Sequence, residues 1–112
     1  MTEADIARAR ARLTEELARL DAEDALGAEA QKVVTLDQQS VGRLSRMDAL
    51  QGQAMAQATS ARRTMRRARI IAALARIDAG AFGTCTECGE DIAMKRLALD
   101  PTTPTCITCA SD

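Results

Sequence analysis

Four cysteines constrain this chain more than any other feature. They form two C-x-x-C pairs, Cys85 with Cys88 and Cys106 with Cys109, with 17 residues between the pairs. Each pair presents two sulfurs from one tight turn, and two such turns facing each other give the tetrahedral four-sulfur set that Zn²⁺ takes in closed structural sites. The pattern predicts one zinc ion on these cysteines. We expect a structural role, because no coordination position is left for water.

Other uses of the cysteines fit less well. Iron held by four cysteines is compatible with the spacing alone, and zinc is the interpretation that the paired motif favours. Disulfides require an oxidising compartment, whereas the acidic first residues show no signal peptide. A thioredoxin-like redox pair would need a strand–helix–strand context, and the sequence shows none.

The composition favours thin helix–helix contacts over a large core and argues against catalysis. The 112 residues include one aromatic residue, Phe82, and no Trp, Tyr or His. Aromatic side chains supply much of the buried area of compact cores, so the Ala, Leu, Ile and Met content suits helix packing. Without His, a glycine-rich phosphate loop or a carboxylate pair in an apolar pocket, we expect no enzyme.

The charge balance bears on partners and location. Fifteen Lys and Arg oppose 16 Asp and Glu, for a net charge of −1, and a zinc–tetrathiolate site would bring this to about −3. Non-specific nucleic-acid binders are usually basic. No apolar run is long enough to span a membrane. We expect a cytoplasmic monomer that binds no specific DNA sequence.

A first helix is expected to begin near Thr2. Thr2 can cap the helix, and Asp5 lies three residues on, where the acid of a capping box belongs. Apolar residues then recur with helical spacing; they are Ile6, Leu13, Leu17 and Leu20. The pattern fades at Gly27, and residues 27–44 show no clean period.

A second helix is expected from about Ser45 to Ala79, with Gly80 at its C-terminal cap. Its apolar residues alternate spacings of three and four, which is typical of a coiled-coil seam. The seam residues are Met47, Leu50, Ala54, Ala58, Ala61, Met65, Ala68, Ala72 and Ala75.

The expected fold is mainly α. Residues 1–79 form an antiparallel two-helix coiled-coil hairpin with its tip at about 27–48 and its turn near residue 39 or 40. Residues 80–112 form a four-cysteine zinc-finger knob, which Phe82 packs against the hairpin base. Glu15 and Glu16 are expected to lie opposite a basic run of the second helix, consisting of Arg62, Arg63, Arg66 and Arg67.

A wider set of residues around the cysteines carries a family resemblance. The set is GTCTECGEDI over residues 83–92, KRL over 95–97, Pro101, CITC over 106–109 and, upstream, GRLSRMDAL over 42–50. It resembles the DksA/TraR family of zinc-finger transcription factors. The resemblance implies a regulator that binds RNA polymerase directly. Its coiled coil would enter the secondary channel, and its tip would modulate promoter complexes.

The resemblance also implies roles for individual residues. It places the tip at Asp48, with Ser45, Arg46 and Asp37 nearby. Better-known members carry D-x-x-D-x-A there, whereas this chain has Ser45 at the first position and Leu50 at the last. Ser45 and Asp48 could instead form a capping box for the second helix, and both interpretations stay open.

Binding of the alarmone ppGpp is expected to be weak or absent. Responsive members carry basic residues just before the proline of the knob and just after the last cysteine, where this chain has Asp100 and Ala110. The remaining cations that could contact polymerase or the alarmone are Arg62, Arg69, Lys95 and Arg96.

Two other functions remain alternatives. The chain could be a zinc-ribbon DNA-binding protein, or an interaction adaptor that uses its coiled coil alone. A salt-dependent mobility shift of free DNA would indicate the first alternative. Co-purification with core polymerase in the absence of DNA would indicate the polymerase regulator.

Overall fold

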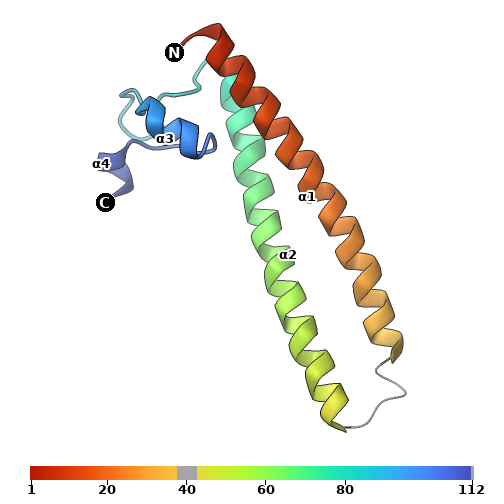
Figure 1. Cartoon of the computed structure of the whole chain (residues 1–112). Coiled ribbons are helices and arrows are strands. Elements are labelled where there is room, and N and C mark those ends of the chain that lie inside the picture. The colour runs from red at the N-terminus through yellow and green to blue at the C-terminus, as the bar shows by residue number, and fades with distance from the viewer. Residues whose placement is uncertain (38–42, 112) are drawn as a thin grey trace. The chain divides into compact units, whose positions relative to one another are not determined.

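The computed structural model describes residues 1–37 and 43–111, without the side chains of residues 29–37, 43 and 44. It contains four helices (Figure 1), which are α1 (Glu3–Asp37), α2 (Arg43–Asp78), α3 (Met94–Leu99) and α4 (Ile107–Ala110). The described residues contain no β-strand, only one isolated bridge. The fold is therefore mainly α, a helical hairpin followed by a small cysteine module. None of the described helices is long and apolar enough to cross a bilayer.

The capping box predicted at the start of α1 is confirmed. The Thr2 amide donates to the Asp5 carboxylate at 2.9 Å, and the Asp5 amide donates to the Thr2 hydroxyl at 3.2 Å. Two backbone groups that the first turn of a helix leaves without partners are thereby satisfied.

The prediction that the first helix fades at Gly27 is wrong, because α1 continues to Asp37. Gly27 is half-buried, and a side chain there would bring its Cβ within 3.2 Å of an Arg63 guanidinium nitrogen. A glycine inside a helix costs about 1 kcal/mol relative to alanine, which neighbouring residues can offset. The predicted turn near residue 39 or 40 lies outside the described residues.

Contacts divide the chain into two compact units, each containing part of α1 and part of α2. The cysteine unit comprises residues 1–17 and 68–112, and the hairpin unit comprises residues 18–67. The division predicted from sequence, a hairpin over residues 1–79 and a zinc finger over residues 80–112, stays a prediction.

The cysteine unit contains all the buried side chains among the described residues. Leu13 of α1 is fully buried, as are Ile70 and Ala73 of α2. Cys85, Ile92 and Leu97 form an apolar cluster, against which Phe82, Cys106 and Cys109 pack. Phe82 also lines a cavity of about 330 Å³ together with residues of α1 such as Ala9. Phe82 therefore lies near α1, and its packing against the base of the hairpin stays a prediction.

The hairpin unit is held by ion pairs between its helices. Arg63 Nε lies 2.5 Å from Asp24 Oδ1, and Arg67 Nε lies 2.9 Å from Asp21 Oδ1. Arg67 also pairs with Asp24. The basic run is thus partly neutralised across the hairpin, as expected, but these two arginines have partners other than Glu15 and Glu16.

The predicted apolar stripe of α1 is confirmed. Leu13 is buried, and Ile6, Leu17 and Leu20 are half-buried.

The predicted seam of α2 is wrong. Its members are exposed, Met65 to 69% and Met47 to 59%. The less exposed face of α2 includes Gln53, Ala56, Ser60, Arg63, Arg67, Ile70, Ala73 and Ile77. Apolar stabilisation scales with the area removed from water, so Ile70 and Ile77 bury more than alanines and determine which face packs.

Candidate metal centre

The first cysteine pair lies in a turn closed by backbone hydrogen bonds. Thr84 and Asp91 form an antiparallel bridge, and the Cys85 amide donates to the Glu90 carbonyl at 2.7 Å. Gly89 follows the pair with φ at +77°, a conformation that favours glycine. The chain therefore reverses tightly after the second sulfur.

The second pair is placed by α4. Cys106 precedes the helix and Cys109 lies within it, and the Ala110 amide donates to the Cys106 carbonyl at 2.9 Å. The Thr86 amide donates to the Pro104 carbonyl at 2.9 Å, which ties the first turn to the chain entering the second pair.

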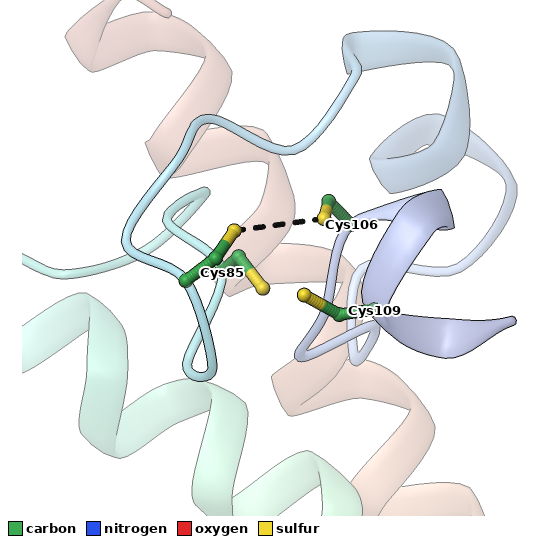
Figure 2. A group of neighbouring side chains, drawn as sticks. Cys85, Cys106 and Cys109 are labelled. Atoms are coloured by element: carbon green, nitrogen blue, oxygen red, sulfur yellow. Dashed lines mark hydrogen bonds between the residues drawn. The ribbon is translucent and has the colours of Figure 1, made fainter. Parts of the chain in front are cut away.

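The four sulfurs converge on one point. All lie within 4.8 Å of one another, and Figure 2 shows the labelled cysteines directed toward a common centre. The dashed line marks the 3.7 Å contact between the Cys88 and Cys106 sulfurs. Sulfurs about 2.3 Å from a tetrahedral zinc ion are about 3.8 Å apart. The site therefore fits one structural Zn²⁺ on Cys85, Cys88, Cys106 and Cys109, as predicted.

Electrostatics support a bound cation. Burial raises the pKa of Cys85, but backbone amides that donate to its sulfur outweigh this effect and lower the pKa to about 6. These amides belong to Cys106, Cys88 and Glu87. The neighbouring sulfurs, first that of Cys106, raise the pKa of Cys109 to about 12. A divalent cation allows all four sulfurs to be thiolates at once.

Arginines hold the segment that links α3 to the second pair. Arg12 of α1 donates to the Ala98 carbonyl at 2.7 Å and to the Leu99 carbonyl at 3.1 Å, at the end of α3. Arg76 donates to the Thr102 carbonyl at 3.2 Å and Arg96 to the Thr105 carbonyl at 3.0 Å. Sequence analysis missed Arg12 and Arg76, because contacts to carbonyls distant in the chain leave no local pattern.

Asp100 stabilises the same segment. Its carboxylate accepts hydrogen bonds from the Thr102 amide at 3.0 Å and the Thr102 hydroxyl at 2.7 Å, and its carbonyl accepts one from the Thr103 hydroxyl. Arg69, one of the candidate cations, lies 3.3 Å from the other carboxylate oxygen. The acid found where the family resemblance expects a base therefore has a structural role.

The predicted tip residues that the structure describes belong to the hairpin unit. Ser45, Arg46 and Asp48 are exposed on α2. Because α2 begins at Arg43, Ser45 lies inside the helix, and the capping box with Asp48 is wrong. Asp37 ends α1, and its side chain lies outside the described residues.

The remaining candidate cations are spread over both units. Arg62 donates to the Thr59 hydroxyl at 3.0 Å in the hairpin unit. Lys95 and Arg96 lie on α3 in the cysteine unit, where Lys95 is exposed. Arg62 therefore belongs to one unit, and Lys95 and Arg96 belong to the other.

Comparisons with known proteins agree with this geometry. Residues 80–112 match the family model of the prokaryotic dksA/traR C4-type zinc finger. The structure of transcription factor DksA2 from Pseudomonas aeruginosa is similar, with a TM-score of 0.85 over 99% of this chain and 84% of that one, at 23% identity. No curated protein matches the sequence. The chain therefore shares the fold of DksA2.

Proposed function

We propose that this chain binds RNA polymerase and regulates transcription, because residues 80–112 match the family model of the dksA/traR C4-type zinc finger. The hairpin would enter the secondary channel and modulate promoter complexes near the active site. The observation that carries the proposal is the family match over residues 80–112, within a chain that shares its whole fold with a transcription factor. The family is not a class of enzymes.

An exposed carboxylate near the start of α2 supports an electrostatic role for this part of the hairpin unit. Asp48 is exposed in the early part of α2, and Ser45 and Arg46 lie beside it in sequence. Because Ser45 is not the N-cap, Asp48 has no capping role to lose. Its exposed carboxylate could act on polymerase groups or on cations of the active-site region.

Purified core polymerase provides the test. We expect the zinc-loaded chain to bind polymerase without DNA and to change promoter output in transcription in vitro. Asp48→Asn is expected to abolish regulation, whereas binding changes by about twofold or less, since one exposed charge contributes little to affinity. Asp48→Glu keeps the charge and is the matched control. If Asp48→Asn regulates like the parent, the tip assignment fails. Binding to free DNA alone would indicate a DNA-binding protein.

We further propose that ppGpp contributes weakly. A polyphosphate needs several converging cations, but Arg69 is engaged by Asp100, and Ala110 supplies no charge. The measurement is promoter output against ppGpp concentration on polymerase that lacks any other alarmone site. Ala110→Lys is the informative variant, because Asp100 holds a turn and its replacement would disturb the fold. Strong synergy with the parent chain would contradict the proposal.

A further inference from the structure

A side chain of α3 contacts the backbone that leads into the second cysteine pair. Arg96 donates from its Nε to the Thr105 carbonyl at 3.0 Å in a partly buried hydrogen bond, and Thr105 immediately precedes Cys106. The carbonyl of the residue before, Pro104, accepts from the Thr86 amide of the first cysteine turn at 2.9 Å. The two residues before Cys106 are therefore held by two different elements, α3 and the first cysteine turn.

The backbone of this segment has no regular structure that would hold it in place. Residues 103–106 belong to neither a helix nor a strand, and Cys106 is extended, with φ at −72° and ψ at 167°. Pro101 and Pro104 lack amide hydrogens, so neither can donate a backbone hydrogen bond. The location of the Cys106 sulfur therefore depends on individual contacts such as that of Arg96.

Arg96 lies on a helix that is anchored to the first cysteine pair. Its neighbour Leu97 is buried in the apolar cluster with Cys85 and Ile92. Arg96 itself is half-buried, whereas Lys95, the residue before it on α3, is exposed. The two adjacent residues carry the same charge in different surroundings, and Lys95 therefore provides a matched control for Arg96.

We propose that Arg96 is a positioning residue of the metal centre and that its hydrogen bond to Thr105 sets the affinity for zinc. Holding Cys106 near the other sulfurs before the ion binds reduces the conformational entropy that binding costs. Groups that orient metal ligands from outside the coordination sphere typically change metal affinity about 10–100-fold when they are replaced. The role lies within the cysteine unit and does not require RNA polymerase to be the partner.

The test is the zinc dissociation constant of the full chain, measured by competition with a chelator under reducing conditions. Three substitutions separate the hydrogen bond from the charge. Arg96→Gln keeps a donor nitrogen at the bond position of Nε and removes the charge, Arg96→Lys keeps the charge and moves the nitrogen one bond farther, and Arg96→Met removes both. Arg96→Met and Arg96→Lys should weaken zinc binding about tenfold or more, and Arg96→Gln about threefold or less.

Lys95→Met is the control, because it removes the same charge from the exposed neighbouring position, and it should change the zinc affinity about twofold or less. Parent-like affinity of Arg96→Met would overturn the proposal. So would parent-like affinity of Arg96→Lys together with weak binding by Arg96→Gln, which would show that the charge acts alone. Even if Arg96→Met does not fold, the other two variants decide the question. The proposal holds if Arg96→Gln binds zinc more tightly than Arg96→Lys, and it fails if the two bind equally or in the reverse order.

Discussion

The cysteine unit and the hairpin unit use the same two long helices and are stabilised in different ways. In the cysteine unit, Leu13 and Ile70 are fully buried, and the metal centre and several arginines hold the remaining chain. In the hairpin unit, none of the described side chains is buried, and Asp21 and Asp24 pair with Arg63 and Arg67 across the helices.

The two units therefore differ in how much their contacts contribute to the free energy of unfolding. Apolar burial stabilises in proportion to area, whereas partly exposed ion pairs contribute about 1 kcal/mol or less each. The described part of the hairpin unit therefore depends on few strong contacts. Its exposed surface, which includes Asp48 and Ala and Met side chains of α2, contributes little apolar burial.

Removing zinc should have the largest effect, and it should fall on the cysteine unit. Metal-binding free energy in such sites is about 10–16 kcal/mol and becomes folding free energy. A chelator, or Cys85→Ser, is expected to abolish hydrogen-exchange protection over residues 80–112 and to reduce it much less over residues 18–67. Protection should return when zinc is added back to the parent chain. Equal loss in both units, or metal-free protein with two disulfides under reducing conditions, would contradict the expectation.

A pair of apolar truncations sharpens the comparison. Ile70→Ala removes a fully buried side chain of the cysteine unit, and we expect a loss of about 2–5 kcal/mol in the free energy of unfolding. Met65→Ala removes a side chain of the predicted seam that is 69% exposed, and we expect a change of about 0.5 kcal/mol or less. Denaturant unfolding of the parent and both variants measures the two changes in the free energy of unfolding. A larger loss for Met65→Ala would restore the seam predicted from sequence.

The parts of the molecule that sequence predicted correctly depend on short-range chemistry. Four sulfurs at C-x-x-C spacing determine a zinc site almost independently of the rest of the fold. Thr2 and Asp5 cap α1 because both groups belong to one turn. In the same way, the leucines of α1 mark one face of one helix.

The parts that sequence predicted wrongly depend on which faces meet. On α2, two stripes share helical spacing, one of Ala and Met and one that contains Arg63, Arg67, Ile70 and Ile77. Periodicity alone does not show which of the two stripes faces α1. The ion pairs with Asp21 and Asp24 join residues far apart in the sequence, so only the structure reveals them. The helical pattern fades at Gly27 for the same reason, because its neighbour Arg63 lies 36 positions away in the sequence.

The ion pairs of the hairpin unit should give a smaller effect than either truncation experiment. A double-mutant cycle of Asp24→Asn and Arg63→Gln is expected to give a coupling of about 1 kcal/mol, because both side chains are less than one-third exposed. The control cycle uses Arg10 and Asp78 in the cysteine unit, an ion pair that is 48% and 68% exposed. Its coupling should be smaller and should vanish sooner as salt is added. Equal coupling in the two cycles would show that burial does not distinguish the two units.

The smallest expected effect concerns the first turn of α1, in the cysteine unit. Hydrogen bonds from Thr2, first from its amide and then from its hydroxyl, hold the pKa of Asp5 below its ordinary value of 3.8. A carboxylate with a lowered folded pKa stabilises fully above its unfolded pKa, and this contribution is lost as the pH falls through the folded pKa. Asp5→Asn removes the titration, so hydrogen-exchange protection of the first turn should be weaker in the variant above about pH 4 and should approach that of the parent in stronger acid.

Acid also releases zinc from both proteins, which is why the difference in protection between parent and variant is the quantity measured. Glu3→Gln removes one charge from the same turn and leaves the capping box in place, and it should reproduce little of this difference. A parent–variant difference that does not change with pH would show that the Asp5 charge contributes nothing to the cap.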